Sequence, residues 1–202
     1  MRRIDVVGQW SDLWLGNGFP GRDPVGCAVR VNAPLLVREA TADDAPAIGE
    51  VHAEAWRVAH RDLFEGHVLR KFVAERRACW AGLMSARDLA RNTVLLAVRD
   101  DRVVAFVHFG PHSDGPPDGE IFDLYAHPSV WGSGVTWTLM DKAWELLREA
   151  GFRRVRLWTM AGANRGRHFY ASFGFVETGR KREHDFGDGR PVLEFEYLQR
   201  TR

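Results

Sequence analysis

Cysteine, long apolar runs and an excess of either charge are scarce or absent in this 202-residue sequence. Cys27 and Cys79 are the only cysteines, and their wide separation indicates neither a disulfide framework nor a zinc site. We therefore expect a reducing, cytoplasmic setting. No apolar run reaches the roughly 18 residues of a membrane-spanning helix. The net charge is only +1, so neither a nucleic acid nor a membrane is favoured as a partner.

Two nucleotide-binding motifs are also missing around the glycine-rich stretch at residues 120–150. No Gly-Lys-Ser/Thr follows its glycines, which excludes a P-loop. The dinucleotide fingerprint G-x-G-x-x-G fails as well, because Trp137 occupies the third glycine position counted from Gly132. This stretch therefore needs another explanation than a standard nucleotide-binding loop.

The same stretch has the pattern of a strand, a turn and a helix. An apolar and aromatic run stops at His127-Pro128, and a helical pattern then continues as far as Gly151. Gly132 and Gly134 between them allow a tight turn and close approach of a ligand. The first N–H groups of a helix lack internal partners, and the helix dipole favours an anion there. We predict a pyrophosphate site, with a plain tight turn as the alternative.

Periodicity elsewhere predicts one mixed α/β domain with the order β-α-α-β-β-β-α-β-α-β-β. A capping box at 41–44, with Pro46 after it, indicates where the first helix begins. The other expected helices lie at about 69–84, 135–150 and 163–173. Strands are expected at 35–37, 93–99, 102–110, 120–125, 153–160, 175–178 and 191–198.

Residues 1–33 lack clear periodicity and contain several glycines and prolines. We interpret them as an irregular N-terminal extension that precedes a domain at residues 34–202. Trp10, Trp14 and Phe19 offer this extension an apolar surface for docking. One candidate for the docking partner is a second subunit, which leaves a homodimer as an open alternative.

With Asn164 and Tyr170 taken into account, the chain resembles the GNAT superfamily of acyl-CoA-dependent N-acetyltransferases over residues 35–198. The resemblance implies a single-domain GNAT-like α/β fold. Its sheet is mixed and mostly antiparallel, its central parallel strands splay apart, and helices flank it. The most specific segments are LYAHPSVWGSGV at 124–135, AGFRRVRLWTM at 150–160 and ANRGRHFYASFGF at 163–175.

The resemblance also implies that acetyl-CoA is a co-substrate lying between the strands EIFDLYA and RVRLWTM. Backbone groups at the end of the first strand would pair with the pantetheine arm, and the glycine turn would bind the pyrophosphate. The amide of Asn164 would bind the cofactor arm, and Tyr170 would lie near the thioester sulfur. The implied cofactor residues are Leu124, Tyr125, Ala126, Trp131, Gly132, Ser133, Gly134, Val135, Thr136 and Asn164.

The glycine turn departs from the family pattern Gln/Arg-x-x-Gly-x-Gly/Ala at two positions. Trp131 replaces Gln or Arg, and Thr136 replaces the last Gly or Ala, whereas Gly134 matches. The branched Thr136 would crowd the phosphates or, through its hydroxyl, donate a hydrogen bond to them. These departures leave a second function open, namely a non-catalytic acyl-CoA-binding or regulatory module.

Acetyl transfer to an amine needs a base for the ammonium proton and an acid for the leaving thiolate. Tyr170 is the expected acid, because a phenol of pKa about 10 keeps its proton at neutral pH. The resemblance implies that Glu120 is the base, because some family members use a glutamate at the start of this strand, and Asp123 is the second choice. Strand alternation places these two carboxylates on opposite faces unless a bulge intervenes. The structural alternatives are an aromatic core residue for Tyr170 and a solvated carboxylate for Glu120.

The acceptor is expected to lie against a different set of residues. His60 and His184 border the acceptor side in the family, while exposed polar residues are the alternative reading. Trp56, Phe64 and Phe186 are candidate aromatic walls. We expect no metal ion, because His108 and His112 lie on a strand and a proline-containing loop rather than on one helix face.

These features predict an acetyl-CoA-dependent N-acetyltransferase that acts on the amine of a small molecule or a peptide. Cys27 and Cys79 both lie outside the predicted cleft. Direct transfer is therefore expected rather than transfer through an acyl-cysteine intermediate. The identity of the acceptor is not encoded in any motif that we recognise.

Overall fold

The computed structural model of the protein describes residues 34–84, 91–113 and 117–201. The predicted order of elements is confirmed, and Trp10, Trp14, Phe19 and Cys27 lie outside the described residues. The strands are β1 Leu36–Glu39, β2 Thr93–Arg99, β3 Arg102–Pro111, β4 Asp118–Ala126, β5 Arg154–Met160, β6 Val176–His184 and β7 Val192–Arg200. The helices are α1 Ala45–Ala59, α2 Gly66–Leu83, α4 Val135–Glu149 and α5 Asn164–Phe173, with short 3-10 helices η1 Ala42–Asp44 and η2 Pro128–Val130.

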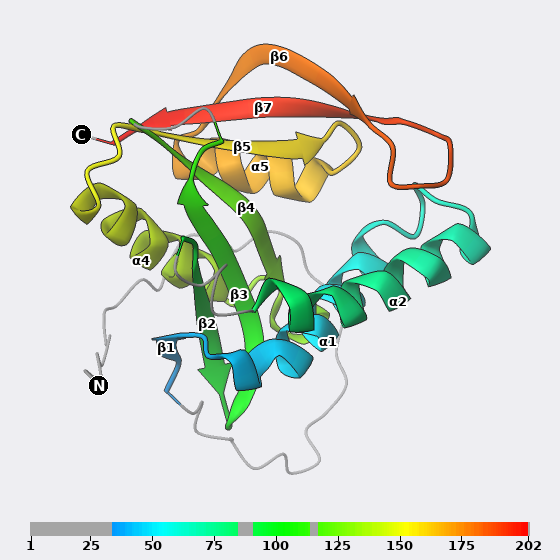
Figure 1. The fold of residues 1–202 in the computed structure, drawn as a ribbon, viewed down its shortest axis with the longest axis horizontal. Coiled ribbons are helices and arrows are strands. Elements are labelled where there is room, and N and C mark those ends of the chain that lie inside the picture. The colour runs from blue at the N-terminus through cyan, green and yellow to red at the C-terminus, as the bar shows by residue number, and fades with distance from the viewer. Residues whose placement is uncertain (1–33, 85–90, 114–116, 202) are drawn as a thin grey trace, which may run out of the picture.

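The seven strands form one sheet in the order β1-β2-β3-β4-β5-β7-β6, and helices lie against it (Figure 1). All neighbouring strands are antiparallel except β4 and β5. The fold class expected from the resemblance is therefore confirmed. None of the helices in the described ranges is long and apolar enough to cross a membrane.

Several element boundaries differ from the expectation by a few residues, and the start of the first helix and the end of β6 are the most informative. The capping box is present, since the Thr41 N–H donates to the Asp44 carboxylate at 2.8 Å, but it opens η1, and α1 begins only at Ala45. Strand β6 was expected at 175–178 but continues to His184. It is an edge strand with every side chain exposed, so no apolar alternation marks its second half.

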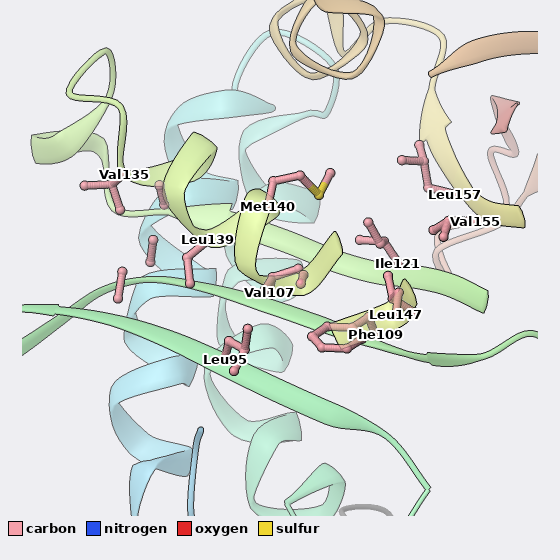
Figure 2. Packing of buried hydrophobic residues seen from close by; sticks show 14 of the residues in the cluster. Leu95, Val107, Phe109, Ile121, Val135, Leu139, Met140, Leu147, Val155 and Leu157 are labelled. Carbon is pink, nitrogen blue, oxygen red and sulfur yellow. The ribbon is translucent and has the colours of Figure 1, made fainter. Parts of the chain in front are cut away.

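The sheet is the middle layer between two apolar clusters. Leu95 of β2 packs toward α4, whereas its neighbours Val94 and Leu96 pack toward α1 and α2, as the two-residue period of a strand requires. Figure 2 shows the α4 side of the sheet, where Leu139 and Leu147 from the helix lie over the strands. Each fully buried leucine of this kind stabilises the fold by about 1.5–3 kcal/mol.

Strands β4 and β5 are paired at only one end. Parallel pairing joins Asp118–Glu120 to Arg154–Arg156, and both strands then continue without further pairing to each other among the described residues. Figure 1 shows β4 turning away from β5 beyond this point. The backbone edges that face each other across this opening are therefore available to a ligand.

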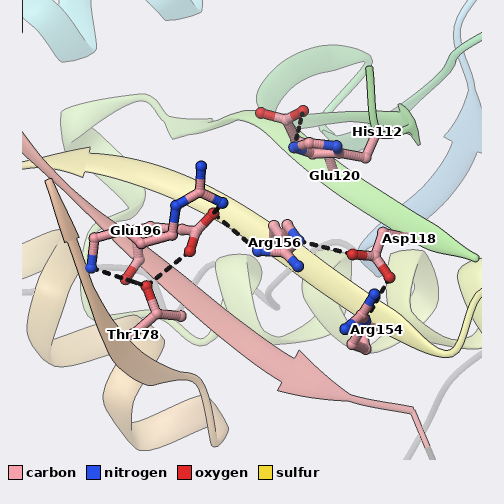
Figure 3. Close-up of polar contacts among 8 residues, drawn as sticks. His112, Asp118, Glu120, Arg154, Arg156, Thr178 and Glu196 are labelled. Carbon is pink, nitrogen blue, oxygen red and sulfur yellow. Dashed lines mark hydrogen bonds and ion pairs between the residues drawn. The ribbon is translucent and has the colours of Figure 1, made fainter. Parts of the chain in front are cut away.

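Ion pairs stabilise the end of the opening at which β4 and β5 are hydrogen-bonded to each other. Asp118 accepts hydrogen bonds from Arg154 at 2.6 Å and Arg156 at 2.8 Å, and Arg156 also reaches the buried Glu196 at 3.0 Å (Figure 3). Burial alone would raise the pKa of Asp118, but the hydrogen bonds from the two arginines hold it below its usual value. Thr178 donates to the other Glu196 oxygen at 2.7 Å. These contacts tie β4, β5, β6 and β7 together beside the site.

Candidate functional site

A cavity of about 1310 Å³ lies in the opening between β4 and β5. At one end it is lined by the turn that precedes α4 and by the first turns of α5. At the other end it is lined by α1, by α2 and by the segment from Arg182 to Phe186. One cavity thus joins the predicted cofactor turn to the predicted acceptor region.

The first turn of α4 presents backbone N–H groups that have no acceptor among the described residues. Gly134 precedes the helix with φ of +82°, a left-handed conformation that glycine adopts without strain. The first helical hydrogen bond runs from the Thr138 N–H to the Gly134 carbonyl at 3.1 Å, so the N–H groups of residues 135–137 have no acceptor within the helix. The Val135 side chain is buried in the core, which leaves only its backbone available to a ligand.

The Trp131 side chain connects this turn to the end of β4. Its indole N–H donates to the Ala126 carbonyl at 2.8 Å, and the Arg165 guanidinium lies over its ring, 4.3 Å from the centroid. Arg165 lines the cavity and brings a positive charge to this end of it. The sequence predicted no role for Arg165, because its contact with Trp131 depends on how α5 packs beside the turn.

Most of the predicted cofactor residues lie together on the cavity wall. The exceptions are Val135, whose side chain is in the core, and Asn164, whose exposed side chain does not line the cavity. Asn164 is the first residue of α5, and its neighbours Ala163 and Gly166 do line the wall. The lining cofactor residues are Leu124, Tyr125, Ala126, Trp131, Gly132, Ser133, Gly134 and Thr136.

Strand β4 contains a β-bulge. Against β3, Asp123 pairs with His108, and the next pair along β3 joins Phe109 to Ile121. Phe122 is therefore an extra residue in β4 with no partner of its own in β3. Such an insertion bends a strand locally and changes which face its next side chains occupy.

The bulge corrects the expectation that Glu120 and Asp123 face opposite ways. Ile121 and Leu124 are three residues apart, yet both pack against the α4 side of the sheet. The residues on the other face are shifted correspondingly, and both carboxylates line the cavity. The sequence analysis allowed for a bulge in this strand, and the structure shows one at Phe122.

Each carboxylate has a histidine beside it. Asp123 lies 3.1 Å from Nδ1 of His108, and its side chain is 25% exposed. Glu120 lies 3.8 Å from Nε2 of His112, and its side chain is 16% exposed (Figure 3). Neither carboxylate is fully desolvated, and both remain accessible from the cavity.

Tyr170 of α5 lines the cavity with its ring packed near Phe175 and Tyr197. Burial raises the pKa of its phenol above the ordinary value, and the nearby Tyr125 and Asp123 raise it further. The hydroxyl therefore keeps its proton throughout the neutral range. Because Asp123 influences this pKa, its carboxylate and the Tyr170 phenol share one electrostatic environment.

The acceptor end is walled by aromatic rings. Trp56 is buried, lines the cavity and donates its indole N–H to the Tyr125 hydroxyl at 3.0 Å. Phe186 also lines the cavity, with its ring centroid 5.4 Å from that of Trp56. Phe64 stacks on Trp56 at 5.6 Å but lies behind it and does not line the cavity.

Buried histidines complete this end. Burial lowers the pKa of both His52 and His60 to about 4, and the positive charge of Arg76 contributes to each shift. Nδ1 of His52 accepts a hydrogen bond from the Trp80 indole at 3.0 Å, so His52 carries its proton on Nε2. Nδ1 of His60 is buried and has no hydrogen-bond partner within the described ranges.

Arg76 is a second site residue for which the sequence prediction assigned no role. Its guanidinium carbon lies 3.9 Å from the centroid of the Trp56 ring, and the residue lines the cavity. A sequence signal was present, because Phe72, Arg76 and Trp80 recur every four residues on one face of α2. A charged residue in the middle of a buried apolar stripe indicates a site rather than a solvated surface.

The sequence model described as the acetyltransferase (GNAT) family matches residues 51–175. This region extends from within α1 to the second residue after α5, and it contains most of the cavity wall. A search of curated proteins finds no match to the chain.

Several solved structures have a similar fold. PaiA N-acetyltransferase from Thermoplasma acidophilum, in complex with coenzyme A, is 18% identical with a TM-score of 0.66, over 82% of this chain and 98% of that one. The yncA protein from Salmonella typhimurium, with its cofactor acetyl-CoA, is 19% identical with a TM-score of 0.62, over 83% and 94%. The ribosomal-protein-S18-alanine N-acetyltransferase from Escherichia coli is 14% identical with a TM-score of 0.60, over 83% and 94%.

Proposed function

Since that family model spans well over half of it, the chain belongs to the acetyltransferase (GNAT) family, and we propose that it transfers the acetyl group of acetyl-CoA directly to the amine of a small molecule or peptide. One observation carries this proposal. A single cavity joins the unpaired N–H groups of α4 to the Tyr170 phenol and to the carboxylates of Glu120 and Asp123. We also propose a cytoplasmic location, from the scarcity of cysteine.

The proposed cofactor site is built mainly from backbone groups. The N–H groups of residues 135–137, together with the positive end of the α4 dipole, suit the pyrophosphate of coenzyme A. The pantetheine arm would follow the free edge of β4 at residues 124–126, with Asn164 a further candidate contact. We propose that Arg165 supplies the positive charge that Trp131 does not.

The proposed chemistry uses acidic and basic side chains from β4 and α5. Glu120 takes a proton from the acceptor ammonium, so that the neutral nitrogen can attack the thioester carbonyl carbon. A carbon–nitrogen bond forms and the carbon–sulfur bond breaks. The Tyr170 phenol gives its proton to the leaving thiolate, and the attacking nitrogen, which becomes positively charged when the bond forms, returns a proton to the phenolate. Asp123 is the second candidate base, and it faces the same cavity.

Direct transfer is favoured over an acyl-cysteine intermediate. Cys79 on α2 lies exposed at the surface and does not line the cavity, so its thiol is not in place to attack a bound thioester. Cys27 lies outside the described residues. A direct attack by the bound amine needs neither sulfur atom.

The decisive experiment measures thiol release from acetyl-CoA by the full-length protein with a panel of amines. Tyr170→Phe should lower kcat by about 10²-fold or more, because the proton donor is lost while the ring remains. Tyr197→Phe is a matched control, since its hydroxyl bonds to Arg167 and Glu177 outside the cavity. Equal rates for the two variants would contradict the role of Tyr170.

The base is identified by comparing Glu120→Gln with Asp123→Asn. Loss of the base should lower kcat by 10²-fold to 10⁴-fold and abolish the acidic limb of the pH–rate profile. We expect this result for Glu120→Gln. The same result for Asp123→Asn alone would transfer the role of base to Asp123.

A non-catalytic acyl-CoA-binding or regulatory module is the second candidate function. The half-buried Thr136 favours it, because this branched residue lines the cavity at the predicted phosphate turn. Calorimetry separates the two functions. Binding of coenzyme A without thiol release for any amine would support the module, and no binding at all would contradict both functions.

A further inference from the structure

Arg76 is the most unusual charged residue of the cavity wall. It lies on the buried face of α2, and its side chain is only 16% exposed. Its guanidinium carbon is 3.9 Å from the Trp56 centroid, 5.4 Å from that of Phe72 and 5.5 Å from that of Phe186. Contacts with ring faces do not use the N–H donors of the guanidinium, which still require hydrogen-bond acceptors.

No hydrogen-bond acceptor serves those donors in the part of the chain that the structure describes. The nearest carboxylate oxygen, on Glu75, lies 3.8 Å away, beyond hydrogen-bond distance, and the Glu75 side chain is about half exposed. The neighbouring Arg77 differs, since it donates two hydrogen bonds to Glu50 at the surface. A mostly buried guanidinium whose nearest carboxylate lies beyond hydrogen-bond distance gains from a ligand that supplies a hydrogen-bonded anion.

The other arginines of the cavity wall do not share this property. Arg182 donates to Glu194 at 2.7 Å, and Arg165 lies exposed at the cofactor end. Arg76 is therefore the lining arginine that is both shielded from water and without a hydrogen-bonded carboxylate, within the residues described. Its location is the acceptor end of the cavity.

Contacts connect Arg76 to the proposed reaction centre. The Trp56 ring under the guanidinium donates its N–H to the Tyr125 hydroxyl, and Tyr125 lies on β4 two residues after Asp123. Burial lowers the pKa of Arg76, while Tyr125 and Asp123 act in the opposite direction. The wall of one cavity thus carries a cation, with the Trp56 and Phe186 rings beside it, and the Asp123 carboxylate.

We propose that Arg76 binds a carboxylate of the acceptor, so that the acceptor is a small amine of the amino-acid type with an apolar side chain. This inference rests on the proposed acetyltransferase function and specifies its substrate class. The acceptor ammonium would face Glu120 and Asp123, and its carboxylate would face Arg76. Its apolar body would lie against Trp56 and Phe186. A zwitterion of this kind pairs its carboxylate with the Arg76 guanidinium and its ammonium with the carboxylates of Glu120 and Asp123.

The test compares amines that differ only in the carboxylate. Thiol release from acetyl-CoA is measured with leucine, methionine and phenylalanine, and with the amide of each, in which the carboxylate is neutral. We expect kcat/KM to favour each acid by 10- to 100-fold, the range expected for one buried charge-assisted hydrogen bond. Arg76→Gln should abolish this preference, and Arg76→Lys should retain part of it, because lysine keeps the charge without the planar fork.

Arg77→Gln is the matched control, because it removes the adjacent arginine from a surface ion pair and should leave the preference unchanged. Calorimetric affinity for coenzyme A, measured on each variant, verifies that the fold and the cofactor end are intact. A structural role for Arg76 would lower the stability of Arg76→Gln but leave the acid-to-amide ratio as in the wild type. That unchanged ratio would overturn the proposal.

A binding measurement separates failure of this inference from failure of the proposed activity. Calorimetry with coenzyme A present records whether the same acids and amides bind, whatever their turnover. Preferential binding of the acids that Arg76→Gln abolishes supports the inference even without thiol release. Thiol release from amides or neutral peptide amines at the rate of the acids overturns it and leaves the acetyltransferase function standing. Equal or absent binding of all six compounds also overturns it.

Discussion

The two ends of the cavity are built in different ways. The cofactor end comes mainly from one continuous stretch, residues 124–137, with α5 beside it, and offers chiefly backbone N–H groups. The acceptor end is assembled from side chains that are far apart in sequence, including Trp56, Arg76 and Phe186. A site built from backbone tolerates substitution of its side chains, as Trp131 illustrates. A site built from side chains determines which acceptor binds, so substitutions there change the specificity for the acceptor.

The largest expected contrast concerns two tryptophans. Trp56→Ala should lower the free energy of unfolding by about 3–5 kcal/mol, because Trp56 is 2% exposed in the centre of the acceptor end. Trp131→Ala should cost about 1 kcal/mol, since that ring is half-buried in the turn, but it should raise KM for acetyl-CoA. Urea denaturation measures the first effect and initial rates the second. Equal destabilisation by the two changes would remove the contrast.

Acidification should weaken the acceptor end specifically. The pKa of His60 is lowered by burial to about 4, against about 6.5 in the unfolded chain. The unfolded chain therefore binds more protons between these values, and stability falls as the pH drops through this window. The expected loss between pH 7 and pH 5 is on the order of 2 kcal/mol, and His52 should add a similar amount.

His60→Phe tests that pH dependence by removing the titratable ring while keeping an aromatic side chain. Because the buried Nδ1 atom has no partner in the described residues, this change should cost little at pH 7 and should reduce the loss at pH 5. His67→Gln is the control, as it removes a histidine whose side chain is 71% exposed. Urea denaturation at both pH values gives the comparison. An undiminished loss in His60→Phe would show that other groups are responsible.

At the cofactor end, the backbone conformation should matter more than the side chain. Gly134→Ala should lower stability by about 1–2 kcal/mol and raise KM for acetyl-CoA, because a Cβ is strained at φ of +82° although nothing lies within 4 Å of it. Gly82→Ala is the matched change, since its Cβ also meets nothing within 4 Å but lies in helix α2. We expect it to stabilise by up to about 1 kcal/mol. A neutral Gly134→Ala would refute the importance of this conformation.

The smallest effect is expected at Arg165. Arg165→Gln should raise KM for acetyl-CoA by about three- to tenfold and leave kcat unchanged, because it removes one exposed charge from a site held by backbone groups. Arg153→Gln, another exposed arginine but outside the cavity, should leave both constants unchanged. Initial rates over a range of acetyl-CoA concentrations measure the difference. A large loss of kcat in Arg165→Gln would mean that the charge acts on the reaction itself.

The contrast between the two ends of the cavity also explains which features could be predicted from the sequence. The order of the elements and the glycine turn were predicted, because alternation, helical periodicity and turn residues are local properties of the chain. The position of the β4 bulge was not predicted, because a phenylalanine such as Phe122 is equally compatible with a paired and with a bulged position in a strand. Arg76 and Arg165 were also missed, because each acquires its role from a ring on a different element, Trp56 or Trp131.

The bulge has a consequence for how this cavity could be redesigned. A regular strand between Ile121 and Leu124 would place a single side chain on the cavity face, whereas β4 has Phe122 and Asp123 there. Deleting Phe122 should leave both flanking core contacts in register and return the strand to simple alternation. The insertion therefore adds one side chain, that of Phe122, to the cavity wall, while the hydrophobic pattern that folds the sheet stays the same.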